Sequence, residues 1–217
     1  MLASNKHIFW QALLVTILIF ALGLVFGVYL EEMRSDNANA IFYQSEADLF
    51  DTLSLTYLLN SQELSCQELN EVYVNFADKI YTEAKNVRQF DDSSKMTSST
   101  KYIHKKYDLL RTILWINIID VQKKCPDVNT VVYLYKYNTD ELNKKAEQGV
   151  FAKILSDLKN KKGNSFILIP IAVDNEIYSL NSFIDSKDIK EFPVIIINDK
   201  NYVYNLTTVA ELEKYLK

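Results

Sequence analysis

The chain has 217 residues, of which 48% are hydrophobic and 12% aromatic, so it can bury a core of ordinary size. Its formal net charge is -4 at pH 7 and no run of Lys or Arg stands out, which excludes the basic surface that nucleic-acid-binding proteins use. The chain holds only 4 Gly and 3 Pro, which favours long helices over a loop-rich sandwich.

The first predicted element is a membrane span at residues 8–30, which carry no charge. As a helix this run extends about 35 Å, enough to cross a hydrocarbon core of about 30 Å. A cleaved signal peptide is the alternative, because residues 37–40 contain an Ala-x-Ala sequence. The apolar run is longer than that of a signal peptide, and the charged EEMRSD separates it from this sequence. We therefore expect an uncleaved signal anchor in the cell membrane.

Residues 1–7 then form a short tail, which we expect to be cytoplasmic. Lys6 and Arg34 flank the span and nearly balance under the positive-inside rule, so these charges alone do not fix the orientation. Within the span, Gly23 and Gly27 form a small-xxx-small pair through which two helices can pack into a homo-oligomer. Glycines are also common in membrane helices in general.

Three amphipathic segments follow the span and predict an all-α helical stalk over residues 31–126. The first two cover about 37–60 and 62–90. The third carries a heptad-like seam at Ile103, Tyr107, Leu110, Leu114, Asn117 and Val121. A strand is the alternative for TILWINII within it, because β-branched residues are frequent there. The polar stretch 91–100 predicts that the second and third helices form an antiparallel hairpin.

The hairpin brings together the two cysteines of the chain, Cys66 and Cys125. A structural disulfide is the favoured interpretation; two buried thiols and a redox-active pair are the alternatives. A disulfide here would close a loop of about 60 residues and contribute about 4 kcal/mol in the chain-entropy model. It would also place residues beyond the span in an oxidising compartment, with the N-terminus cytoplasmic.

From residue 129 the pattern changes to alternating strands and helices. Strands are predicted at 130–137, 165–174, 194–199 and 202–206, and helices at 139–163 and about 179–191. A two-residue turn is expected at Lys200-Asn201, and Thr208 and Glu211 have the spacing of a capping box before a last helix. The expected order is β-α-β, a helical crossover, a β-hairpin and a helix.

This order, with EFPVIIINDKNYVYN at residues 191–205, resembles the thioredoxin-like fold over residues 129–217. A flavodoxin-like or other small α/β domain is the alternative. The resemblance implies a cis peptide at Pro193, with a peptide-binding groove formed by Phe192, Pro193 and Val194.

The resemblance also implies a CxxC motif at the end of the first strand. In this chain Asn138, Thr139, Asp140 and Glu141 occupy those positions. Without thiols the position cannot attack a disulfide, and Asn138 and Glu141 have the spacing of a helix cap and its partner. We expect no metal site and no cofactor, because His7 and His104 stand apart from other ligand residues and no phosphate-binding motif occurs.

These features predict a single-pass membrane protein with a redox-inactive, extracytoplasmic thioredoxin-like domain. It would contact the lipid bilayer and a protein partner of unknown identity, as an interaction or assembly module. A membrane-tethered thiol–disulfide oxidoreductase or chaperone that uses Cys66 and Cys125 is the first alternative. A self-assembling envelope scaffold is the second.

Overall fold

The computed structural model describes residues 3–61, 64–91 and 98–216. The chain divides into two compact units, Met1–Phe50 and Asp51–Lys217.

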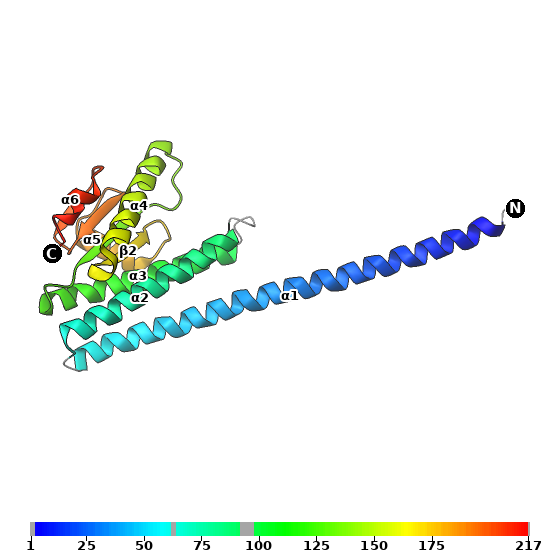
Figure 1. Ribbon diagram of the computed structural model, residues 1–217, viewed down its shortest axis with the longest axis horizontal. Helices are drawn as coiled ribbons and strands as arrows, with labels where there is room; N and C mark the ends of the chain where they lie inside the picture. The colour runs from blue at the N-terminus through cyan, green and yellow to red at the C-terminus, as the bar shows by residue number, and fades with distance from the viewer. Residues whose placement is uncertain (1–2, 62–63, 92–97, 217) are drawn as a thin grey trace. The chain divides into compact units, whose positions relative to one another are not determined.

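Helix α1, Ala3–Ser61, is one continuous helix (Figure 1). Its apolar part, His7–Met33, has a mean hydropathy of 2.7 and is fully exposed, which confirms a helix long and apolar enough to cross a membrane. Trp10 and Tyr29 lie near its two ends. The prediction of a separate helix from about residue 37 was wrong, because the backbone continues through EEMRSD without a break. The charged residues interrupt the hydrophobicity but do not oppose helix formation.

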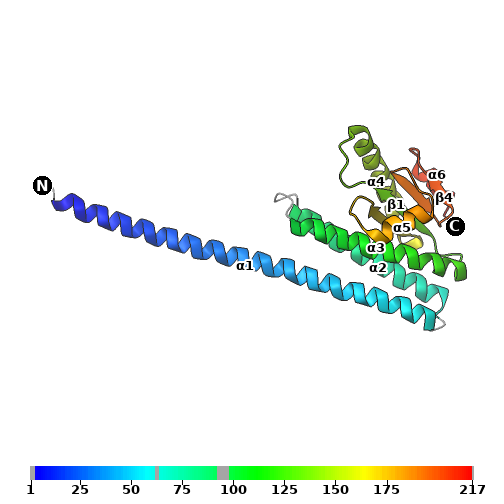
Figure 2. The same ribbon diagram turned by 180° about the vertical axis from the view of Figure 1, so that it is seen from behind.

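Helices α2, Cys66–Asp91, and α3, Ser98–Lys124, form the predicted hairpin and lie side by side in Figures 1 and 2. The alternative of a strand at TILWINII was wrong, since these residues lie within α3. The seam of α3 faces the interior: four of its six residues are buried, while Ile103 and Asn117 are half-buried. Ser65 and Glu68 cap the start of α2, with the Ser65 backbone N–H donating to Glu68 Oε2 at 2.9 Å.

The sheet has four strands in the order β2-β1-β3-β4. Their bounds are Thr130–Tyr135 for β1, Ile167–Ala172 for β2, Val194–Ile197 for β3 and Asn201–Val203 for β4. Strands β1 and β2 are parallel, whereas β3 runs antiparallel to both β1 and β4. The C-terminal region is therefore a mixed α/β structure with a mixed sheet, preceded by helices.

Helices cover both faces of the sheet. On one face, Phe151, Leu155 and Leu158 of α4, Leu142–Lys162, pack with Leu212 of α6, Val209–Glu213. A short 3-10 helix, Gly163–Ser165, follows α4. On the other face, α5, Tyr178–Ser186, packs beside α2 and α3. The buried Trp115 of α3 packs edge to face against Phe183 of α5, with the ring centroids 4.7 Å apart.

The hairpin and the sheet share one hydrophobic core. Residues from α2, α3, β1, β2, α5 and β3 belong to the same buried cluster. The predicted boundary between a stalk ending at residue 126 and a domain starting at residue 129 therefore does not separate two cores.

Side-chain hydrogen bonds fix the turn after β3 and the start of α6. The predicted turn between β3 and β4 is present but begins earlier than expected: it covers 198–200, and Asn201 already belongs to β4. Asn198 and Asp199 take left-handed conformations there, with φ of 52° and 54°. Asn198 Oδ1 accepts the Thr130 backbone N–H at 2.8 Å and so fixes this turn against β1. The capping box of Thr208 and Glu211 is confirmed. Hydrogen bonds donated by the Thr207 side chain and by the Thr208 backbone and side chain lower the pKa of Glu211, with Thr207 contributing most.

Candidate functional site

The candidate site lies where the parallel strands β1 and β2 end. Carboxyl ends of parallel strands lie at the same edge of a sheet, and ligands of open α/β sheets bind outside that edge. The chain segments 136–141 and 173–177 leave the sheet here. The segment before β3 arrives at the same edge, because Leu134 of β1 pairs with Val194 of β3.

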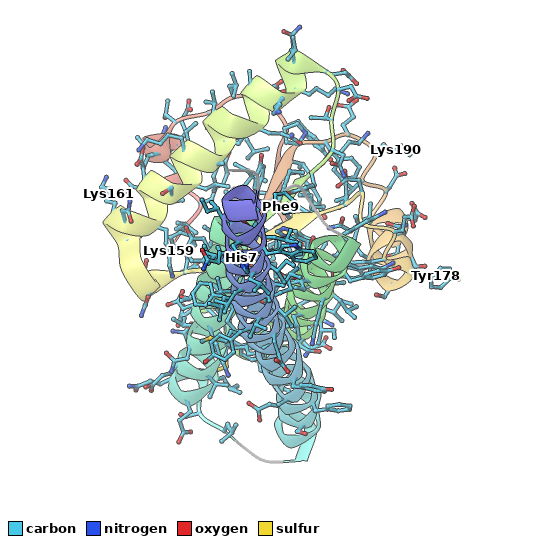
Figure 3. All side chains as sticks on the ribbon, turned by 90° about the vertical axis from the view of Figure 1, so that its right-hand side faces the viewer. His7, Phe9, Lys159, Lys161, Tyr178 and Lys190 are labelled. Carbon is cyan, nitrogen blue, oxygen red and sulfur yellow. A yellow bond between two sulfur atoms is a disulfide. The ribbon has the colours of Figure 1, made fainter. Side chains whose placement is uncertain are left out.

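A groove of about 410 Å³ opens at this edge. Its apolar surface comes from Val173, Ile184, Ile189 and Phe192, while Lys136, Asp174, Asn181, Asp185 and Lys190 provide polar groups. Figure 3 shows the side chains of Lys190, which lines the groove, and Tyr178, at the start of α5, projecting outward. Tyr178 is 87% exposed. The groove thus combines apolar contact area with charged groups of both signs.

Two polar side chains fix the backbone after β1. The Asp174 carboxylate accepts the backbone N–H of Tyr137 at 2.8 Å and that of Asn138 at 2.7 Å. Gln148 of α4 accepts the Lys136 backbone N–H at 2.7 Å and donates to the Lys136 carbonyl at 3.1 Å. The rim of the groove is therefore held by hydrogen bonds from two neighbouring elements.

The predicted helix cap at Asn138 was wrong. Helix α4 begins at Leu142, its N-cap is Glu141, and the Glu141 side chain makes no capping hydrogen bond. The physical reason is Asp174, which binds the backbone of Asn138 and holds the chain in a turn before the helix can start. Glu141 instead pairs with Lys144 at 3.4 Å on an exposed surface. Thr139 and Asp140 lie in the same connection.

The peptide bond between Phe192 and Pro193 is cis, as expected. The pairing of Leu134 with Val194 puts Pro193 beside the end of β1. Of the three residues predicted for the groove, Phe192 lines it, whereas Pro193 and Val194 are buried.

A buried polar cluster lies behind the groove and was missed by sequence reasoning. Asp108 and Arg111 of α3 are only 3% and 6% exposed. Their side chains form an ion pair, with Arg111 Nη1 3.1 Å from Asp108 Oδ1. Asp108 also accepts hydrogen bonds from the Ala172 backbone at 3.3 Å and from the side chain of buried Asn175. Burial raises the pKa of the Asp108 carboxyl, and the Arg111 guanidinium opposes that shift.

The disulfide between Cys66 and Cys125 is confirmed, with Cα atoms 5.5 Å apart. Cys66 is exposed and Cys125 is buried. Cys125 precedes β1 and the groove follows it, so the length of β1, about 20 Å at 3.3 Å per residue, lies between them. The disulfide is therefore remote from the groove.

The two histidines belong to different units of the chain. His104 is buried on α3 with its ring centroid 5.2 Å from that of Tyr137, while His7 is exposed at the start of the apolar segment. Across the described parts of the chain, no three His, Cys, Asp or Glu side chains gather in a way that could hold a metal ion.

The small-residue pair of the apolar helix lies on an open surface. Gly23 and Gly27 line a groove of about 570 Å³ along α1, and a Cβ added at either position would meet nothing within 4 Å. This surface leaves room for the close approach of a second helix.

Comparison with family models, with curated proteins and with solved structures gave no match.

Proposed function

We propose that this is a single-pass membrane protein whose C-terminal unit is an extracytoplasmic, redox-inactive interaction module of thioredoxin-like type. Residues 1–7 are cytoplasmic, and α1 crosses the membrane as an uncleaved anchor. The groove at the ends of β1 and β2 takes up a segment of a protein partner, so that the protein serves as an adaptor or assembly factor of a membrane complex.

The anchor and the orientation are supported by two independent features. The His7–Met33 segment has the length and hydropathy of a membrane span. The disulfide needs an oxidising compartment, and both of its cysteines follow the span in the sequence. Together these features support a C-terminal unit outside the cytoplasm.

The thioredoxin-like assignment is supported by strand order and by the loop before β3. The β2-β1-β3-β4 sheet, with helices on both faces and a cis-proline beside the end of β1, is the arrangement that the resemblance implies. A groove beside such a proline binds extended peptides through backbone pairing, which requires no cysteine.

The observation that carries the redox-inactive assignment is the location of the two cysteines. They form a disulfide beyond the opposite end of β1, while Asn138, Thr139, Asp140 and Glu141 occupy the position where catalytic thiols would lie. Thiol–disulfide exchange needs an accessible thiolate next to the bound substrate, and the groove residues supply none.

Two further functions compete with this proposal. In the first, the disulfide itself exchanges with a partner, which the exposure of Cys66 would permit. In the second, the open surface at Gly23 and Gly27 drives self-assembly into a scaffold.

Photo-crosslinking in native membranes tests the proposal. A photoreactive phenylalanine analogue replaces Phe192 in the groove and, as a matched control, Tyr81, an exposed aromatic residue on α2. We expect a discrete adduct with another protein from position 192 and none from position 81. Adducts of equal yield from both positions, or none from position 192, would contradict the proposal. An adduct with a second copy that disappears in Gly23→Leu would favour the scaffold.

A further inference from the structure

Asp108 links the helical hairpin to the segment that forms one side of the groove. Its Oδ1 accepts the Ala172 backbone N–H at 3.3 Å, and its Oδ2 accepts the Asn175 side-chain amide. Val173 and Asp174, which lie between these two attachment points, both line the groove. Asp108 of helix α3 is therefore hydrogen-bonded to segment 172–175 on both sides of these two groove residues.

The hydrogen bond between Asp108 and Ala172 uses a backbone N–H of β2, an edge strand, that points away from the sheet. The backbone N–H groups of Ile167 and Val173 point toward the β1 side, where they bond to Asn129 and Tyr135. Because N–H directions alternate along a strand, those of Leu168 and Ala172 point away from β1, and Pro170 between them has none. The Asp108 carboxylate accepts the Ala172 N–H. At this end of the edge strand β2, a helix side chain therefore takes the place that a neighbouring strand would otherwise occupy.

Further hydrogen bonds connect segment 172–175 to the opposite rim of the groove. Asp174 binds the backbone N–H groups of Tyr137 and Asn138, next to the groove residue Lys136. The connection therefore runs from the Asp108–Arg111 pair through residues 172–175 to residues 136–138. Each contact along it is a hydrogen bond to a carboxylate, which is stronger than one between neutral groups. The contacts of Asp108 are buried, whereas the contact between Asp174 and Asn138 is exposed.

We infer that Asp108 is a positioning residue for the groove, through which the packing of the helical hairpin determines the geometry of the groove rim. Its importance for binding rests on the proposed function, but the coupling itself belongs to the fold. A ligand that orders the rim stabilises the Asp108 contacts, and disruption of those contacts by movement of α3 weakens binding in return.

Amide hydrogen exchange on the full-length protein in detergent micelles tests this coupling without any partner. Asn175→Ala removes one hydrogen-bond donor and leaves the Asp108–Arg111 pair intact, whereas Asp108→Asn removes the charge. In both variants we expect the amides of Tyr137 and Asn138 to exchange at least about tenfold faster. The amides of β3 serve as the reference for global opening and should keep their wild-type rates. Thr112→Val is the matched control, since it removes a buried hydrogen bond internal to α3.

The inference is overturned if Asn175→Ala leaves the amides of residues 137 and 138 at their wild-type rates. It is also overturned if these amides accelerate only in step with β3, because that pattern reports general destabilisation. Asn175→Ala decides the question even if Asp108→Asn, which leaves Arg111 buried without its counter-charge, does not fold. Because no ligand is used, failure here is distinguishable from failure of the crosslinking experiment.

Discussion

Deleting residues 1–33 is expected to move the protein completely from the membrane fraction to the soluble fraction. The deletion removes the apolar segment His7–Met33. Within the residues that the structure describes, this segment is the helix that is long and apolar enough to span a bilayer. In the proposed topology this segment is also the export signal, so the deleted chain should stay in the cytoplasm, where Cys66 and Cys125 remain reduced. Carbonate extraction of membranes and alkylation of thiols measure the two effects on the same sample.

A cleavable signal peptide in place of residues 1–33 is the matched control. This version should be exported, soluble and resistant to alkylation, because its two cysteines oxidise outside the cytoplasm. The account is contradicted if carbonate extracts the full-length protein from membranes. A mature chain that begins after the Ala-x-Ala sequence at residues 38–40 would show instead that the apolar segment is a cleaved signal peptide.

The second large effect is expected from removing the disulfide. Cys66→Ser should lower the free energy of unfolding by about 4 kcal/mol, because the unfolded chain regains the freedom of a closed loop. The two cysteines are 59 residues apart in sequence. Urea unfolding of the full-length protein in detergent, followed by tryptophan fluorescence of buried Trp115, measures the difference.

The choice of cysteine matters for this measurement. Cys66 is exposed, so a serine hydroxyl there stays solvated, whereas Cys125 is 2% exposed and a serine would also bury a polar group. Cys125→Ser should therefore destabilise at least as much as Cys66→Ser. Wild-type protein treated with a reductant should unfold like Cys66→Ser. If both forms unfold at the wild-type urea concentration, the disulfide does not stabilise the structure.

Local patterns were sufficient to predict much of the fold. The seam of α3 has a heptad-like spacing, so its direction toward the core could be inferred from Tyr107, Leu110 and Leu114. An antiparallel hairpin brings the start of α2 beside the end of α3, so the positions of Cys66 and Cys125 at those two ends predicted their contact. The order of strands and helices followed from changes in hydrophobic periodicity, and a capping-box spacing marked the start of α6.

Features set by tertiary contacts could not be predicted in this way. Asn138 has the spacing of a helix cap, but Asp174, which is 36 residues away, binds its backbone first. The packing of the hairpin on the sheet depends on side chains distant in sequence, so the helices alone suggested a separate stalk. Asp108 and Arg111 have the spacing of an exposed ion pair, and only their burial beneath segment 172–175 distinguishes them.

The claim that the C-terminal unit carries no thiol chemistry is tested most directly by a disulfide-reduction assay on the purified full-length protein. Insulin is incubated with dithiothreitol, and its precipitation is followed with and without the protein and its Cys66→Ser variant. We expect the uncatalysed rate in all cases, because the groove lacks a thiol and the disulfide lies beyond the far end of β1. Accelerated reduction by the wild-type protein that is lost in Cys66→Ser would contradict the account and identify an oxidoreductase.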